Sequence, residues 1–307
     1  MREDGLSTPD RVLAERTLGR RAQALADALG GIGQGSAADN AGLRKAAAEL
    51  SGELPNHAAL SLDGQHLGGL DLVGTGLDTA LSHGAWTLDA QFSAHRLFAD
   101  TSLIQMSGAN LERRGTVGLA YRGLRGRWHG SLGLDSLGAH DLVQWGLGYD
   151  YTWSPRLELS LNYTRNGLSE DSAVLRAGGA RDRLEVTVDT ALTGRLFANF
   201  SLAHNRYHSR AGGTLGDGYS ADWTLGQRYW LGTNRLNLSL SGSLLHNHLA
   251  SKLPQDLAQR LPAGSGVGDA LPKEYRSVGL GVDLARGDPA APYPDVASPR
   301  YALGVWG

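Results

Sequence analysis

A chain of 307 residues with 41% apolar side chains is long enough for one large β domain or for two ordinary domains. A formal charge of −2 without a basic run gives no reason to expect nucleic acid as a partner, and the absence of cysteine excludes disulfides, thiolate metal ligands and cysteine nucleophiles. No run of roughly eighteen apolar residues occurs, so a transmembrane helix is not expected. Glycine is common, with 43 residues against four phenylalanines, which suits a water-filled barrel better than a packed core.

The N-terminal segment is charged and is predicted to be helical. Residues 8–29 have Thr8 as the helix cap, Pro9 in the first turn and leucines at roughly helical spacing. A second, shorter helix is expected over residues 43–50, and we assign residues 1–56 to a periplasmic α-helical segment. Because the first residues lack the apolar core of a signal peptide, we expect that a signal has been removed or that the chain is part of a longer protein.

From His57 onward the hydrophobic period changes from that of a helix to two. The clearest stretch, residues 142–166, reads LVQWGLGYDYTWSPRLELSLNYTRN, and its apolar and aromatic residues alternate with polar residues and glycine. This pattern predicts two antiparallel strands joined by a tight turn at Ser154-Pro155. Each strand would be about ten to twelve residues long, the length of a tilted strand that crosses a bilayer.

Similar hairpins fill the rest of the chain, and short connections alternate with long ones. Short turns are expected at 83–84, 123–126, 154–155, 193–194 and 232–234, and long connections at 99–110, 167–182, 207–216 and 249–273. This alternation is typical of outer-membrane barrels, which have short periplasmic turns and long outer loops. Four tryptophans near the short turns predict an aromatic belt at one membrane interface: Trp86, Trp128, Trp153 and Trp230.

The pattern gives thirteen strands, so we predict an all-β transmembrane barrel over residues 57–307. Bacterial single-chain barrels have even strand numbers, so we expect this barrel to be incomplete at its C-terminus; three more strands would close a sixteen-strand barrel and one more would close fourteen. The longest insertion, residues 249–273, contains three prolines. We expect it to lie outside the cell and to fold over the mouth or into the lumen.

The period of two also assigns a polar face, which in a barrel faces the lumen. Acidic residues on that face outnumber basic ones, and an acidic wall favours cationic cargo. Simple solvation explains any single charge equally well, so the prediction concerns the set. The predicted pore-lining residues are the acids Asp78, Asp89, Asp135, Asp150, Glu158, Glu185, Asp189, Asp222 and Asp283 and the bases Arg122, Arg127 and Arg228.

No catalytic, cofactor-binding or metal-binding constellation is recognised in the sequence. His95, His129 and His204 fall on predicted strands without a partnered serine or carboxylate at a defensible spacing, and nucleophile-elbow, phosphate-loop and zinc-helix motifs are absent. Glu185 and Asp189 share a face but lie about 13 Å apart along the strand, too far for an acid/base pair. We therefore expect a protein that is not an enzyme and that has no cofactor.

Three features of the chain resemble the C-terminal porins of synthase-dependent exopolysaccharide exporters: the helix-to-barrel junction at 50–57, the aromatic hairpins with Trp86 and Phe92 and with Trp145 and Tyr163, and the loop at 253–282. This family includes the cellulose, poly-N-acetylglucosamine and Pel secretion porins, and the chain looks most like the Pel member over residues 57–307. The resemblance implies a preceding tetratricopeptide superhelix, of which residues 1–56 would be a remnant. It also implies a cationic, partly deacetylated polymer and periplasmic secretion proteins or a lipoprotein ring as partners.

The main hypothesis is a passive conduit in the bacterial outer membrane that exports a cationic exopolysaccharide to the cell surface in biofilm formation. Its other partners would be outer-membrane lipids, and its energy must come from elsewhere because no nucleotide-binding motif is present. The alternatives are a general diffusion porin and an outer-membrane barrel enzyme or adhesin. A conduit needs many weak sites along its lumen, whereas an enzyme needs one convergent polar cluster, so evenly spread acids favour the conduit.

Overall fold

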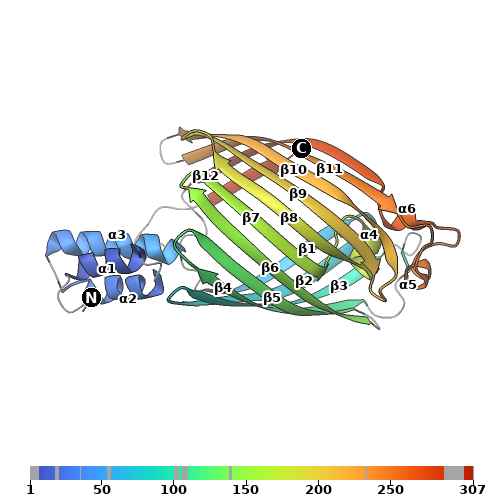
Figure 1. Cartoon of the computed structure of the whole chain (residues 1–307), viewed down its shortest axis with the longest axis horizontal. Coiled ribbons are helices and arrows are strands. Elements are labelled where there is room, and N and C mark those ends of the chain that lie inside the picture. Colours follow the sequence, from blue (N-terminus) through green and yellow to red (C-terminus); the bar gives the residue numbers. More distant parts are fainter. Residues whose placement is uncertain are drawn as a thin grey trace.

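The computed structural model describes residues 7–17, 21–34, 36–53, 57–99, 104–105, 110–137, 140–231, 234–286 and 301–306. Three helices begin the chain: α1 (Thr8–Thr17), α2 (Arg21–Gly31) and α3 (Ala37–Glu53). They pack at one end of a barrel of strands (Figure 1). Among the described residues, no helix is long and apolar enough to cross a membrane.

The N-terminal helices form a small bundle with an apolar centre. Val12 of α1, Ala24 of α2 and Leu43 of α3 are all buried in one cluster. Arg11 on α1 also forms an ion pair with Asp27 on α2 at 2.9 Å. The single helix expected over residues 8–29 is therefore wrong, because two helices that fold back on each other can bury their apolar stripes and one continuous helix cannot.

Thirteen strands follow in one antiparallel sheet, in which each strand pairs with the next one in the sequence. They are β1 (His57–Leu67), β2 (Leu70–His83), β3 (Trp86–Ala99), β4 (Leu111–Arg122), β5 (Gly126–Leu137), β6 (His140–Ser154), β7 (Leu157–Gly167), β8 (Gly179–Ala191), β9 (Leu196–Ser209), β10 (Thr214–Leu231), β11 (Asn234–Leu249), β12 (Glu274–Arg286) and β13 (Tyr301–Trp306). The expected barrel of thirteen strands is confirmed. No ladder joins β1 to β13 within the described ranges, and the strand number of a closed barrel stays a prediction.

Several strands extend further toward the long loops than the sequence pattern suggested. β4 begins at Leu111 instead of Thr116, β8 begins at Gly179 inside the expected loop 167–182, and β10 begins at Thr214 instead of Tyr219. Beyond the lipid, both faces of a strand meet polar surroundings, so the alternation of apolar and polar residues disappears although the pairing continues. An expectation based on alternation alone therefore placed the starts of these strands too late in the sequence.

Large apolar side chains cover the outside of the barrel and are exposed there, as lipid-facing residues must be. Examples are Val73, Leu88, Phe92, Val117, Leu132, Leu147, Val186 and Leu225. Register pairs such residues with one another across neighbouring strands, for example Leu77 with Phe92 and Val117 with Leu132. The outer face is therefore a continuous apolar band.

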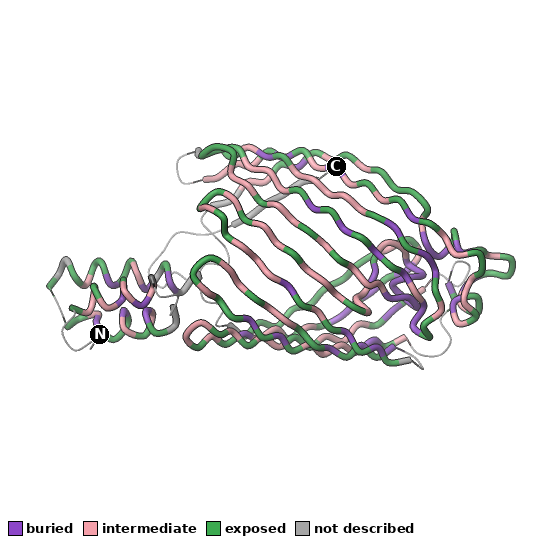
Figure 2. Tube along the Cα trace, in the orientation of Figure 1, coloured by how far each residue is buried: buried purple, intermediate pink, exposed green. Residues whose placement is uncertain are grey.

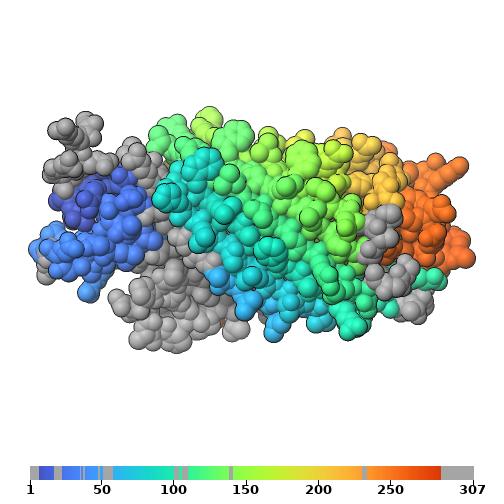
Figure 3. All heavy atoms as spheres, turned by 90° about the horizontal axis from the view of Figure 1, so that it is seen from below, coloured from blue at the N-terminus to red at the C-terminus, as the bar shows by residue number. Residues whose placement is uncertain are grey.

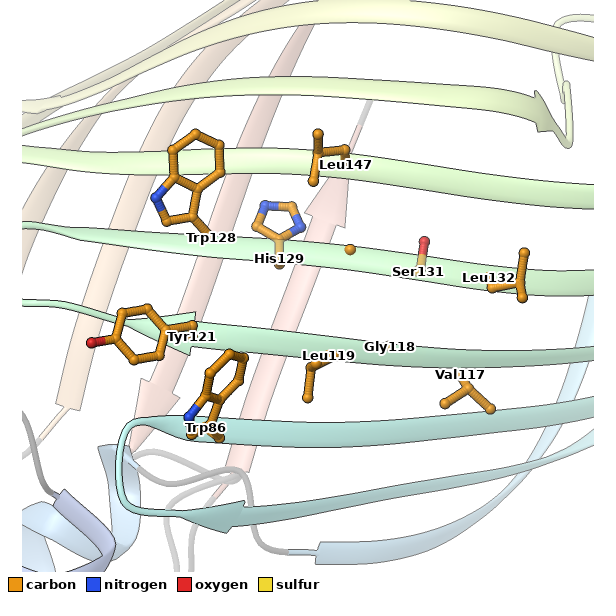
Figure 4. A pocket seen from close by; sticks show the side chains of 11 residues that line it. Trp86, Val117, Gly118, Leu119, Tyr121, Trp128, His129, Ser131, Leu132 and Leu147 are labelled. Atoms are coloured by element: carbon orange, nitrogen blue, oxygen red, sulfur yellow. The ribbon is translucent and has the colours of Figure 1, made fainter.

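Aromatic side chains end this band near the short turns. Trp86 packs on Tyr121 with ring centroids 4.8 Å apart, and Trp128 packs on Tyr149 at 4.3 Å. Figure 4 shows Trp86, Tyr121 and Trp128 together at the turn ends of their strands, beside an apolar groove of about 690 Å³. The arrangement is that of an interfacial aromatic belt. The side chain of Trp230, also predicted to belong to this belt, lies outside the described residues.

Substitution of Leu132 by arginine is expected to lower the free energy of unfolding of the barrel by about 2–4 kcal/mol, because Leu132 is 61% exposed on the apolar band. Ser131, the next residue and exposed on the inner face, is the matched control, and Ser131→Arg should cost far less. Gly148 would be a poor control, since a Cβ there would clash with His129 and Asn162. Refolding into bilayers measures both costs, and equal values would contradict the assignment of the faces.

Candidate functional site

The face opposite the apolar band carries the predicted pore-lining residues. Register places on it Asp78 (β2), Asp89 (β3), Arg122 (β4), Arg127 and Asp135 (β5), Asp150 (β6), Glu158 (β7), Glu185 and Asp189 (β8), Asp222 and Arg228 (β10) and Asp283 (β12). The pairing brings Arg127 opposite Asp150 and Glu158 opposite Asp189. That these residues line a water-filled path remains a prediction.

Some inner-face carboxylates are held by neutral donors. Asn199 donates a hydrogen bond to Asp189 at 2.6 Å, and Ser243 donates one to Asp222 at 2.6 Å. Both acids stay partly or fully exposed to the interior. Because an amide or hydroxyl donor does not neutralise a carboxylate, Asp189 contributes negative charge to the inner surface, whereas Asp222 also interacts electrostatically with Arg183.

Other inner-face acids are paired with arginine. Glu185 accepts hydrogen bonds from Arg183 and from Ser201, and Arg183 lies on the same strand. The longer strands also bring Arg114 and Arg181 to the inner face, which sequence reasoning had left out. The acid excess of this face is therefore smaller than the sequence suggested.

The end of the barrel with the long loops is closed by packed side chains. The connection from β7 to β8 forms α4 (Ala173–Gly178), and Ser172 caps it by accepting a hydrogen bond from the Leu175 amide at 3.1 Å. All residues of α4 are buried, although the sequence suggested a polar loop there. Figure 2 shows that buried segments concentrate at this end of the molecule.

The connection from β11 to β12 packs on α4 from outside. It contains α5 (Gln255–Ala258) and α6 (Val267–Ala270), and it buries Leu257, Leu261 and Leu271 in one cluster with α4. The same cluster includes Leu70, Leu97 and Leu137 from the ends of β2, β3 and β5. Residues 249–273 therefore pack against α4 and the strand ends, and Figure 3 shows this segment at the end opposite the N-terminal helices. That the segment lies outside the cell and occludes the path stays a prediction.

A buried ionic network lies beneath this apolar cluster, and we call Glu112, Asp135, Arg176 and Arg210 the mouth network. Arg176 on α4 donates two hydrogen bonds to Glu112 on β4, each 2.6 Å long. Arg210, after β9, donates to Asp135 on β5 at 2.7 Å. The four side chains are nearly or fully buried. The two acids and two arginines pair directly, and Arg114 adds a third cation that interacts with both acids. Buried charges are tolerated when they are paired and hydrogen-bonded in this way.

The mouth network joins parts of the wall that are far apart in sequence. Glu112 and Arg176 are 64 residues apart, and Asp135 and Arg210 are 75 residues apart. His95 on β3 lies 3.6 Å from Glu112 and 2.9 Å from Asp63 on β1, which extends the network to the first strand. The contacts therefore tie α4 to strands on the other side of the mouth.

Burial disfavours the charged form of Arg176, but the hydrogen bonds and negative charge of Glu112 outweigh this, so the pKa of Arg176 is raised. Arg176 therefore stays a cation at physiological pH. Asp135, expected in a solvated wall, has no exposed surface and serves as a partner of Arg210. The physical reason is that the inward α4 and the β9–β10 turn cover it.

Sequence reasoning missed Arg176 and Arg210 because it assigned both to long connections, and it missed Glu112 because it began that strand only at Thr116. One local signal existed: Ser172 followed by Ala-Val-Leu is typical of a capped helix with an apolar face. A short-range periodic pattern cannot show that Arg176 pairs with Glu112, because the two residues are 64 positions apart. Among the described residues, no group of three or more histidines and acids could hold a metal ion.

The comparison with known families decides what kind of barrel this is. The family model described as "PelB, C-terminal beta barrel domain" matches residues 52–307. The chain belongs to this family. As a PelB-type barrel domain it is an outer-membrane β-barrel of a polysaccharide-export family. None of the curated proteins compared with this PelB-type barrel matches it.

Solved structures similar to the PelB-type barrel include other outer-membrane proteins. CdiB from Escherichia coli has a TM-score of 0.42 and 11% identity, with 77% of this chain and 52% of CdiB covered. OmpT from Vibrio cholerae has a TM-score of 0.33 and 8% identity, with 73% and 95% covered. OccD3 from Pseudomonas aeruginosa has a TM-score of 0.32 and 12% identity, with 81% and 84% covered. The chain spans about half the length of CdiB.

Proposed function

We propose that the chain forms a passive, acidic conduit that guides a cationic exopolysaccharide from the periplasm through the outer membrane. One observation carries the proposal: on the inner face, Asp189 accepts a hydrogen bond from Asn199 and Asp222 accepts one from Ser243, and both donors are neutral. Asp89, Asp150 and Glu158 lie on the same face, spread over β3, β6 and β7. Spread carboxylates attract a cationic polymer along its path without holding it at one point.

The size of each attraction suits transport. A carboxylate and an ammonium group in contact through water attract each other by roughly 1 kcal/mol, and salt reduces this further. Many such contacts draw a polymer in, while no single one stops it. The cargo class and the periplasmic partners of the helical segment come from family membership and stay proposals.

The closed mouth favours a regulated conduit over an open diffusion porin. In the described residues, Leu175, Leu257 and Leu271 are fully buried where the path would leave the barrel. A general diffusion porin has a water-filled channel through its whole length. We propose that the structure represents the resting conduit, and that passage of polymer requires α4 and the loop 249–273 to move.

Replacing five inner-face acids by their amides is expected to abolish cation preference while leaving the barrel folded. The set is Asp89, Asp150, Glu158, Asp189 and Asp222, and Glu185 is omitted because Arg183 already pairs with it. Single replacements should change little, since the charges act together. Selectivity is measured as the reversal potential across a salt gradient. The measurement uses a protein that lacks residues 251–271, so that ions can cross the mouth.

Three exposed acids on the outer side supply the matched control: Asp141→Asn, Asp217→Asn and Glu274→Gln. This triple variant should stay as cation-selective as the parent. In cells, the five-acid variant of the full chain should secrete less of the cationic polymer. A five-acid variant with unchanged reversal potential and unchanged secretion would refute the acidic conduit, and width alone would then select the cargo.

A further inference from the structure

We propose that the inner face carries a sugar-binding subsite near the short turns, where one hexosamine unit of the polymer stacks on Phe197. The inference rests on the proposed function and names the chemistry that receives the polymer on the periplasmic side. A hollow of about 390 Å³ lies there, and its lining includes Phe197, the acids Glu158 and Asp189, and the arginines Arg156, Arg195 and Arg228. Its volume falls in the range of small-molecule sites.

Phe197 differs from the other phenylalanines in its direction. Phe92, Phe98 and Phe200 are all about half exposed on the outer side of the barrel. Phe197 instead pairs with Ala191 and with Gly226 in the inward-facing register, and its ring is half-buried. An aromatic ring on a wall otherwise rich in glycine, serine and asparagine calls for a partner with an apolar surface.

Gly226 makes room for this ring. A Cβ atom at Gly226 would lie 2.1 Å from the end of the Phe197 ring, so the ring lies over the glycine backbone. With no side chain beneath it, the ring stays close to the wall and leaves the lumen in front of it open. The pair Phe197 and Gly226 therefore forms a flat platform on the inner face.

A cationic side chain already lies over the Phe197 ring. The guanidinium carbon of Arg228 lies 4.8 Å from the centroid of the Phe197 ring. The Arg228 side chain is exposed, so it can leave this position at little cost. A protonated hexosamine would bring both a cation and the apolar C–H face of its ring to the same place.

Polar partners for the sugar lie beside the platform. Glu158 and Asp189 face each other on β7 and β8, and both line the hollow. Asn199 donates a hydrogen bond to one oxygen of Asp189, and the carboxylate keeps further acceptor capacity for an ammonium or hydroxyl group. An inorganic cation would contact only the two carboxylates, whereas an amino sugar would contact the carboxylates and also the Phe197 ring.

The test measures binding of two oligosaccharides to the full chain in lipid nanodiscs by isothermal titration calorimetry. The probes are a glucosamine hexamer, which is cationic, and an N-acetylglucosamine hexamer, which is neutral. Phe197→Leu should weaken both by about three- to tenfold, because stacking is lost for both. Phe200→Leu, a matched change on the outer face of the same strand, should leave both dissociation constants unchanged.

Two further variants separate the platform from a general structural effect. Gly226→Ala keeps the ring but displaces it, and it should weaken both probes as Phe197→Leu does. Arg228→Gln removes the competing cation and should tighten binding of the glucosamine hexamer about threefold or more. Saturation-transfer NMR should show the sugar C–H protons in contact with protein in the parent and lose that signal in Phe197→Leu.

Failure of this subsite and failure of the acidic conduit give different results. If the parent binds both hexamers equally well but Phe197→Leu weakens both, the subsite stands and the acidic selection falls. If Phe197→Leu binds as tightly as the parent, or if Phe200→Leu loses as much, the subsite is overturned. Absence of measurable binding of either hexamer to the parent also overturns it.

Discussion

Replacement of Glu112 by alanine is expected to open the outer mouth and to lower the free energy of unfolding by about 3–5 kcal/mol. The substitution leaves the Arg176 guanidinium, which is 3% exposed, without the carboxylate that accepts its two hydrogen bonds. A buried charge that has lost its partner is driven toward water. Because Arg176 lies on α4, its movement would displace this helix from the mouth. Single-channel conductance in planar bilayers should rise, and denaturant unfolding should show the loss of stability.

Two controls distinguish the ionic tie from simple loss of packing. A double variant, Glu112→Gln with Arg176→Met, removes both charges and should stay closed, because neither partner is left as a buried ion. Glu274→Gln removes an exposed acid that lies 3.3 Å from His246 and should change stability by less than about 1 kcal/mol. A Glu112→Ala channel with parental conductance would show that the mouth network does not hold the mouth closed.

Shortening the β11–β12 loop is expected to produce the largest rise in conductance. In this variant, residues 251–271 are replaced by a short glycine-serine linker. The apolar cluster around α4 then loses Leu257, Leu261, Val267 and Leu271. Each fully buried side chain of this kind contributes about 1.5–3 kcal/mol through burial, so the remaining cluster cannot stay packed over the lumen. Water then reaches α4, and ions can cross the mouth.

The barrel itself should survive this deletion. β11 pairs with β10 along its whole length and with β12 from Asn234 to His246, and these ladders lie outside the deleted segment. As a matched control, Gln255→Ala with Gln259→Ala changes two exposed side chains of the same loop and should leave conductance unchanged. Parental conductance in the shortened protein would mean that residues 251–271 do not close the path.

Local sequence determined the wall of this barrel. From Val143 to Tyr163 every second side chain is apolar or aromatic, and the structure pairs Leu147 with Tyr163 on the outside and Gly148 with Asn162 on the inside. Such pairing follows from the two-residue period of a strand, which any short stretch of sequence contains. The same reasoning gave the thirteen strands, the short turns and the side of the wall on which Asp150 and Glu158 lie.

Only the tertiary structure decided which charges are solvated and which are locked away. Asp135 and Asp189 both sit at inward positions of their strands, yet Asp135 is buried against Arg210 and Asp189 remains exposed beside Asn199. The difference arises because α4 and the β9–β10 turn fold over one end of the lumen. Contacts between residues tens of positions apart depend on how the whole sheet curves and which loops reach across it, and a two-residue period holds no information about either.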